Sequence, residues 1–202
     1  MARTGWHDLK RALAVRPPAK VAEHVRFKAA VAVVLRDGAS GLDVLFIRRA
    51  EHPADPWSGQ MAFPGGRSEP GDADLRETAM RETAEETGID LEAHGECFGA
   101  LDEVRALSRM RPMDLTIQPF VFRLLRPCEE VLSDEVVGVH WLPLDDLLGP
   151  AHRDMLDYSW NDQTLRLPCF RIDGRVIWGL TYRMFSNLED LLEAGAGAAI
   201  RP

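Results

Sequence analysis

The segment from Asp74 to Gly88 is bounded as one helix, and it constrains the fold more than any other stretch of the chain. Asp74 stands three residues before Glu77, which is the capping-box spacing of a helix N-terminus. Gly88 can adopt the left-handed conformation that ends a helix. Upstream lies GGRSEPGD, whose glycine pair lets the backbone approach a ligand closely because glycine has no Cβ. We therefore expect a glycine-rich loop that leads directly into a helix N-terminus.

The same helix carries Glu82, Glu85 and Glu86 within five positions. Like charges at i, i+4 cost an isolated helix about 0.2–0.5 kcal/mol. On a helical wheel Glu82 and Glu86 fall beside Leu75, at the edge of the apolar stripe, where a partly desolvated carboxylate is costly unless a cation neutralises it. Oxygen ligands without His or Cys favour a hard ion, so Mg²⁺ or Mn²⁺ is the predicted cofactor. The alternative is a solvated acidic helix face.

The segment GGRSEPGDADLRETAMRETAEETGI (65–89) resembles the Nudix box, G-x5-E-x7-R-E-U-x-E-E-x-G-U, in which U is apolar. It departs from that pattern because Asp72 replaces the first Glu, one additional residue precedes Arg81, and Thr83 replaces an apolar residue. The resemblance implies a Nudix-type α/β/α sandwich with a mixed central sheet. It also implies metal-dependent hydrolysis of a nucleoside diphosphate linked to another group.

By position, the resemblance assigns Glu82, Glu85 and Glu86 as metal ligands and the backbone carbonyl of Gly65 as a further ligand. Arg81 corresponds to the residue that orients the glutamates by ion pairing. Glu82 or Glu85 is the first choice for the general base, so the catalytic set expected from the resemblance is Glu82, Glu85 and Arg81.

Cations and an aromatic ring elsewhere are candidates for binding the substrate, since arginine suits bidentate contacts to phosphate. These candidates are Arg48, Arg49, Trp57, Arg109 and Arg111. Two of the arginines close the segment LDVLFIRR, and two lie in RALSRMRPMD (105–114), which we expect to form a loop. Trp57 would either stack on a base or pack under its loop. Glu135 is a candidate additional acid or base, the alternative being a surface charge.

Two further stretches, GQMAFPGG (59–66) and VIWGLTYRMFSNLEDLL (176–192), look like the coenzyme A pyrophosphatase branch of the family. Coenzyme A-like substrates are therefore favoured. That branch usually carries an Arg where this chain has Asp55, and a carboxylate there would repel the 3′-phosphate of coenzyme A. ADP-ribose, a nucleotide sugar or a dinucleotide is accordingly an alternative substrate. A non-catalytic Nudix-like ligand sensor is the rival from a different functional class.

The rest of the chain predicts an α+β fold in a single domain over 1–202, with an N-terminal helical extension (1–25) and a flexible tail (195–202). No βαβ alternation points to a Rossmann sheet. Further helices are expected at 3–15, 142–148 and 179–194. Strands are expected at 26–37, 42–49, 61–63, 96–103, 115–125, 137–142 and 165–178.

The composition limits the kinds of partner that we expect this chain to bind. No apolar run approaches the roughly 20 residues that cross a bilayer, so we expect no membrane association. The net charge of −8 disfavours binding to nucleic acid. Three scattered cysteines without CxxC spacing, and no secretory h-region, favour a reducing cytoplasm. The expected partner is a small nucleoside diphosphate derivative, and the sequence leaves open whether the chain forms a homodimer.

Overall fold

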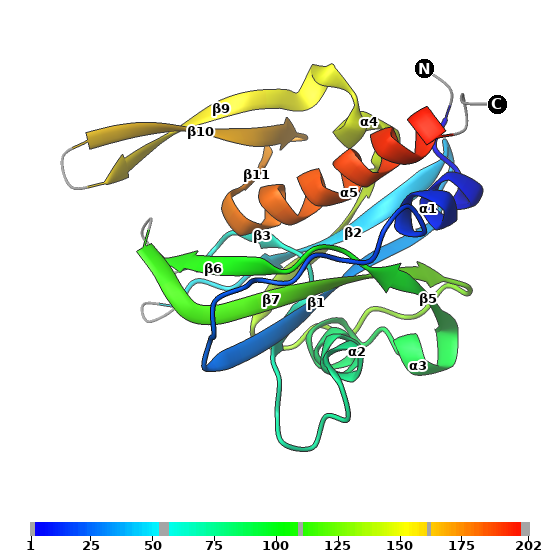
Figure 1. Ribbon diagram of the computed structural model, residues 1–202, viewed down its shortest axis with the longest axis horizontal. Coiled ribbons are helices and arrows are strands. Elements are labelled where there is room, and N and C mark those ends of the chain that lie inside the picture. The colour runs from blue at the N-terminus through cyan, green and yellow to red at the C-terminus, as the bar shows by residue number, and fades with distance from the viewer. Residues whose placement is uncertain (1–2, 53–56, 109–110, 161–162, 199–202) are drawn as a thin grey trace.

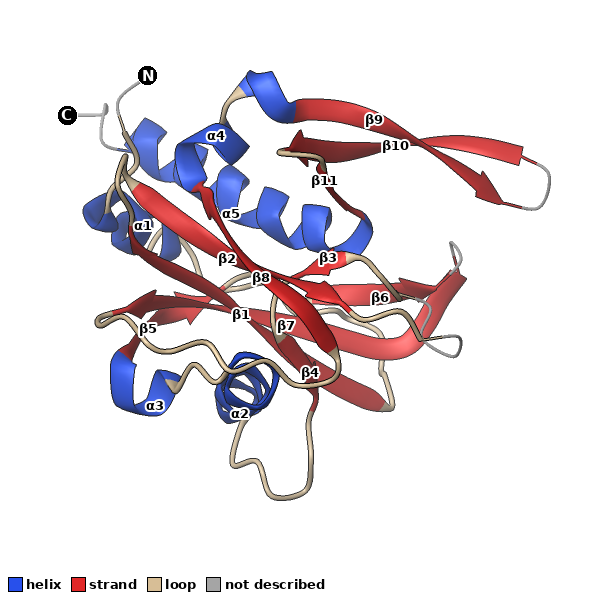
Figure 2. Ribbon diagram, turned by 180° about the vertical axis from the view of Figure 1, so that it is seen from behind, coloured by secondary structure: helices blue, strands red, loops and turns tan. Residues whose placement is uncertain are grey.

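The computed structural model describes residues 3–52, 57–108, 111–160 and 163–198. These residues form a large mixed sheet with helices on both faces and a smaller antiparallel sheet beside it (Figures 1 and 2). The helices are α1 (Trp6–Leu13), α2 (Leu75–Thr87), α3 (Leu91–His94), α4 (Leu144–Leu148) and α5 (Gly179–Ala198), with a short 3₁₀ turn at Pro150–His152. The α+β architecture and the mixed central sheet are confirmed.

The central order of the large sheet is β3-β2-β1-β7-β5, with β4 paired to β1, β6 to β7 and β8 to β2. β1 and β7 run parallel from the pair Phe27↔Leu115 to the pair Leu35↔Arg123, whereas the other pairs given for this sheet are antiparallel. The strands are β1 (Phe27–Asp37), β2 (Leu42–Arg49), β3 (Met61–Ala62), β4 (Gly65–Arg67), β5 (Gly95–Ala100), β6 (Val104–Ser108), β7 (Arg111–Leu124) and β8 (Val136–Pro143).

Strand β1 divides its side chains between two cores. Ala30 and Val34 pack with Ala79 of α2, while Val33 and Leu35 pack on the opposite face with the core that α1 and α5 complete. Its nearly continuous apolar run is typical of a strand that is buried on both faces. Figure 1 shows α2 and α3 on one side of the sheet and α1 and α5 on the other. The predicted α/β/α layering follows from this alternation.

The smaller sheet is built from β9 (Arg153–Trp160), β10 (Gln163–Ile172) and β11 (Arg175–Trp178) in the order β11-β10-β9. Asp173 and Gly174, with φ of 49° and 75°, form the two-residue turn between β10 and β11. Such an Asp-Gly pair is a strong hairpin signal. Phe170 packs edge-on against Phe185 of α5 at a centroid distance of 5.4 Å, which fixes this sheet over the helix (Figure 1).

Several sequence expectations were wrong at this level. The segment 165–178, expected as one strand, is the β10–β11 hairpin, and β9, β4, β6 and α3 were not predicted. In the expected loop at 105–114, the residues up to Ser108 belong instead to β6 and those from Arg111 onward to β7. Ala106 is buried there, and Arg105 donates a hydrogen bond to the carbonyl of Met113. Helix α5 continues through Ala198, into the segment expected as a tail.

Hydrogen bonds hold the N-terminal extension against the loop that follows β5. Arg16 donates two 2.6 Å hydrogen bonds to the carboxylate of Asp102, and the same carboxylate accepts the amide of Ala19. Helix α1 packs against α5, where Leu9 and Ala12 are fully buried. Among the described residues, no helix is both long and apolar enough to cross a membrane.

Candidate active site

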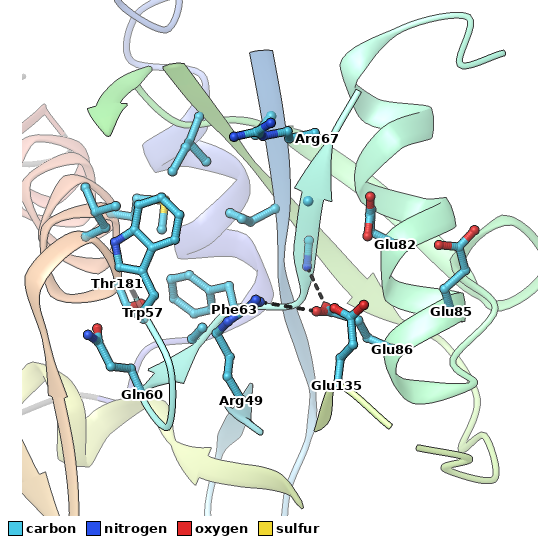
Figure 3. Close-up of a pocket in the computed structure, with 18 of the residues that line it drawn as sticks. Arg49, Trp57, Gln60, Phe63, Arg67, Glu82, Glu85, Glu86, Glu135 and Thr181 are labelled. Atoms are coloured by element: carbon cyan, nitrogen blue, oxygen red, sulfur yellow. Dashed lines mark hydrogen bonds and ion pairs between the residues drawn. The ribbon is translucent and has the colours of Figure 1, made fainter. Parts of the chain in front are cut away.

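A cleft of about 440 Å³ opens between the N-terminal part of α5, strands β1 and β4, and the face of α2 that carries the glutamates. Figure 3 shows Glu82, Glu85 and Glu86 on one side and Trp57, Gln60 and Thr181 on the other. The cleft brings together most of the residues that the sequence singles out. These are Gly65, Arg81, Glu82, Glu85, Glu86, Arg49, Trp57 and Glu135.

Glu86 lies at the base of this cleft and is only 4% exposed. The amide of Gly65 donates a 2.8 Å hydrogen bond to its Oε2 atom, and Arg49 stands 3.6 Å from its Oε1 atom (Figure 3). Burial nevertheless dominates and raises the pKa of Glu86 to about 7, against the lowering effects of Gly65 and Arg49. Near pH 7 this carboxyl group is therefore only partly ionised, because Gly65 and Arg49 do not offset the cost of burying its charge.

Glu82 shares the cleft and depends on the absence of a side chain at Gly66. Its side chain is 19% exposed, and burial raises its pKa against the lowering effect of Arg81. A Cβ atom on Gly66 would stand 2.5 Å from the Glu82 carboxylate, far inside van der Waals contact. The glycine turn thus provides the space that this carboxylate occupies.

Arg81 links the glycine loop to the glutamates. Its Nε and Nη2 atoms donate to the two oxygens of Asp72 at 2.9 and 3.1 Å, while Nη1 lies 3.1 Å from both Glu82 and Glu85. The guanidinium holds the pKa of Asp72 well below its usual range, helped by the amide of Glu69. Asp72 therefore anchors Arg81 in spite of its shorter side chain, and Arg81 in turn orients two of the three glutamates.

Among the described residues, no three His, Cys, Asp or Glu side chains converge closely enough to form a metal site as they stand. The Glu85 side chain is 60% exposed and pairs with Arg81, so its carboxylate does not converge with the other two glutamates. The donor chemistry still suits a hard cation, since five glutamates line the cleft and Glu86, the most buried of the three from α2, has a raised pKa. Glu82, Glu85 and Glu86 are therefore the side chains that fit such an ion.

Some of the residues expected to contact the substrate line the cleft, and others do not. Arg49 and Trp57 line the cleft, and Glu135 does so with an exposed side chain. Arg48 is not among the lining residues, and its side chain is exposed, although it is adjacent to Arg49 in β2. Asp55 and Arg109 lie outside the described residues, and Arg111 is described only through the backbone of β7.

Sequence reasoning missed several lining residues, of which Arg67 is the most informative. It is an exposed cation at the cleft, 5.2 Å over the ring of Phe27, and its carbonyl accepts a hydrogen bond from Arg81. Its position directly after the glycine pair was an available signal. Phe63, Leu115 and Ile117 supply an apolar wall that no motif indicated.

The comparisons with known proteins define the class. The model of the NUDIX domain matches residues 26–159, which is more than half of the chain, and the chain therefore belongs to the Nudix family. It is 29% identical over 150 residues to an uncharacterised Nudix hydrolase, NudL, of Yersinia enterocolitica, covering 72% of this chain and 71% of that protein. Together these matches support an enzyme that hydrolyses pyrophosphate bonds.

Another relative is an uncharacterised protein of Schizosaccharomyces pombe, 43% identical over 110 residues, or 53% of this chain and 33% of that protein. This chain therefore spans only about a third of that relative. Among solved structures, an Ap4A hydrolase binary complex of C. elegans matches with a TM-score of 0.50 and 24% identity, over 61% of this chain and 84% of the other. A MutT/nudix family protein of Enterococcus faecalis matches with a TM-score of 0.50 and 19% identity, over 89% and 64%. These two likenesses support the fold.

Proposed function

We propose that the chain hydrolyses the diphosphate bond of a nucleoside diphosphate derivative, with Mg²⁺ or Mn²⁺ held by Glu82, Glu85 and Glu86. The observation that carries this proposal is the Glu86 carboxylate, buried at the base of the cleft with a raised pKa and only partial neutralisation. A buried carboxylate without full neutralisation is costly, whereas in a cleft that receives a cation it is useful. Gly65 would add its backbone carbonyl to the same site.

The chain's own residues supply positioning and charge. Arg49 and Arg67 stand on the cleft wall, where guanidinium groups suit the oxygens of a diphosphate. Arg81 orients the carboxylates from behind through its ion pairs with Glu82 and Glu85. A bound divalent ion would neutralise the diphosphate and favour deprotonation of water.

A carboxylate must also accept a proton from the attacking water. Glu82 and Glu85 are the first candidates, and Glu135 is a third because its exposed side chain lines the same cleft. Water then adds across the P–O–P bond, and the products are a nucleoside monophosphate and the phosphate monoester of the second group.

Coenzyme A-like compounds are the first substrate class to test, because GQMAFPGG and VIWGLTYRMFSNLEDLL look like the corresponding branch. Asp55 argues for discrimination against coenzyme A relative to its dephospho form. A panel of coenzyme A, dephospho-coenzyme A, ADP-ribose, NADH, nucleotide sugars and dinucleoside polyphosphates, read by product mass, distinguishes these classes. Binding of a panel member without release of any product would favour the ligand-sensor alternative.

The test of the metal site is Glu86→Gln, which removes a charge without removing volume. We expect kcat to fall at least about 10²-fold at saturating Mg²⁺, while the far-ultraviolet circular dichroism spectrum is unchanged. The matched control is Glu129→Gln, an exposed residue away from the cleft, which should keep wild-type turnover. Near wild-type turnover of Glu86→Gln would remove Glu86 from the assignment.

A further inference from the structure

A second pocket of about 400 Å³ lies between the small sheet and the N-terminal half of α5. Its volume falls within the range of small-molecule sites. Tyr158 comes from β9, Leu167 from β10, Trp178 from β11 and Tyr182 from α5, so three strands and a helix build it together. No sequence motif predicted this pocket.

The second pocket adjoins the glutamate cleft. Trp57, Gln60 and Leu180 line both spaces. Figure 3 shows Trp57 and Gln60 across the cleft from Glu82 and Glu85. A ligand whose diphosphate lies beside the glutamates can therefore extend past Trp57 into the second pocket.

The chemistry of the two spaces differs. Glu69, Glu82, Glu85, Glu86 and Glu135 line the first, whereas no carboxylate occurs among the described residues that line the second. The second is walled chiefly by rings and aliphatic side chains, with Tyr158 and Trp178 packed at a centroid distance of 5.1 Å. Arg183, the only charged side chain among these lining residues, is exposed. Such walls favour an uncharged apolar ligand.

The segments that build the pocket lie mostly outside the matched family domain. That match ends at residue 159, whereas β10, β11 and α5 begin at Gln163, Arg175 and Gly179. Most residues that line the second pocket thus come from the chain's C-terminal part, whose helix α5 also contributes Leu180, Thr181 and Met184 to the glutamate cleft. Substrate preference can be set there independently of the hydrolytic chemistry.

We propose that this second pocket binds an uncharged, apolar group esterified to the far phosphate of the substrate. This inference rests on the proposed function and narrows it. The substrates are diphosphates esterified at both ends, with the nucleoside against the apolar wall of the first cleft and the second group beyond Trp57. Nucleoside diphosphates without a second ester, and derivatives whose second group is charged, leave the pocket unused.

The test is a series of synthetic β-phosphate esters of ADP, with methyl, butyl, hexyl and octyl groups and one phenylpropyl group, assayed with Mg²⁺. We expect kcat/KM of the wild type to rise about three- to fourfold for each buried methylene until the pocket is filled. A gain with the alkyl series alone identifies an aliphatic group, and an excess gain with phenylpropyl identifies an aromatic one. An equal kcat/KM for the methyl and octyl esters overturns the proposal.

Leu167→Asp tests the pocket itself, because Leu167 is a half-buried lining residue of β10. A carboxylate there should abolish the dependence on chain length. The matched control is Thr164→Asp, on the same strand but exposed and not lining the pocket, which should keep the wild-type dependence. Asn187→Trp fills the pocket from α5 and gives a second test if Leu167→Asp does not fold. An unchanged dependence in a folded lining variant overturns the proposal.

Binding separates this inference from the hydrolase proposal. Methylene-bridged analogues of the methyl and octyl esters cannot be hydrolysed, and calorimetry measures their affinities in Mg²⁺. If no ester is hydrolysed but the octyl analogue binds more tightly in the wild type and not in Leu167→Asp, the pocket assignment stands and the hydrolase proposal fails. If esters are hydrolysed but both analogues bind equally, the pocket assignment fails alone.

Discussion

At the scale of single residues, Gly65 and Gly66 each need to lack a side chain, but for different structural reasons. Gly65 has a φ of 150°, and a Cβ atom there would stand 2.3 Å from the carbonyl oxygen of Ala30. A Cβ atom on Gly66 would instead have the flexible end of the Glu82 side chain as its nearest neighbour, at 2.5 Å. One glycine is required by the backbone, and the other by the position of a carboxylate.

We therefore expect Gly66→Ala to displace the Glu82 carboxylate and to reduce kcat about tenfold or more, with a thermal midpoint close to that of the wild type. Gly65→Ala should destabilise the fold by about 1–3 kcal/mol, because its backbone conformation is strained for an L side chain. Activity assays and thermal unfolding of both variants measure the difference. Full activity of Gly66→Ala would show that the Glu82 position does not depend on this glycine.

The same loop shows what a sequence pattern can and cannot specify at a residue. The glycine pair predicts a close approach of the backbone, and a close approach is present. The resemblance assigns the carbonyl of Gly65, whereas the contact that the structure describes is the hydrogen bond from its amide to Glu86. Which backbone group points inward depends on pairing of β4 with β1, and that pairing is set by residues distant in sequence.

At the scale of elements, the N-terminus of α2 is determined locally. The Asp74 side chain accepts the amide of Glu77 at 2.9 Å, and the Glu77 side chain reaches back to the amide of Ala73 at 2.6 Å. Asp74→Ala should cost about 1 kcal/mol of unfolding free energy, measured by urea denaturation. Glu129→Gln should stay within about 0.5 kcal/mol of the wild type. An equal stability of both variants would mean that packing alone holds this end of α2.

The N-terminal extension provides a prediction with a defined pH dependence. Arg16 lowers the pKa of Asp102 through a hydrogen bond and its charge, and the amide of Ala19 lowers it further. A carboxyl with a depressed folded-state pKa contributes stability that is present above its unfolded pKa, about 3.9, and is lost as pH falls through the folded value. Asp102→Asn should therefore lower the unfolding free energy by about 1 kcal/mol at pH 7.

The difference between Asp102→Asn and the wild type should be constant from pH 7 to about pH 5 and should narrow below pH 4, where the wild-type carboxyl also becomes protonated. Urea denaturation at each pH measures it. The control is Asp134→Asn, an exposed carboxyl distant in sequence from this contact, which should show little difference at any pH. A difference that widens as the pH falls would contradict the ion-pair account.

Elements with strong local signals were predictable, and those that depend on partners were not. Helix α2 has caps at both ends, and β1 and β2 have long apolar runs, so their ranges nearly match the expected ones. Strand β9 is largely exposed, and its alternation is short, with Leu156 and Tyr158 only half-buried between exposed residues, so its local signal is weak. Strand β4 has three residues and forms because β1 offers an edge.

At the scale of the whole molecule, the site exists only through tertiary arrangement. The β2 residue Arg49, the α2 glutamates and Glu135 before β8 reach one cleft because β2 pairs with β8 and α2 packs on β1. The box motif predicts which carboxylates belong together. It cannot predict that Arg49 lines the cleft while Arg48 does not, since that depends on how β2 pairs with β8, where the register shifts between these two residues.

Occupation of this cleft by an ion should stabilise the entire fold, because a ligand that binds only the folded state shifts the unfolding equilibrium. At a free Mn²⁺ concentration of about 100 times Kd, the gain is about 2.7 kcal/mol, or roughly 5–10 °C in Tm for a chain of this size. Thermal unfolding with Mn²⁺, and after its removal by a chelator, measures the shift. Glu86→Gln should lose most of this stabilisation, whereas Glu129→Gln should keep it.

Unlike turnover, this measurement needs no substrate, so it tests the carboxylates as ion ligands separately from the chemistry. An equal shift in Glu86→Gln and the wild type would place the ion away from the buried carboxylate and contradict the assignment of Glu86 as a ligand.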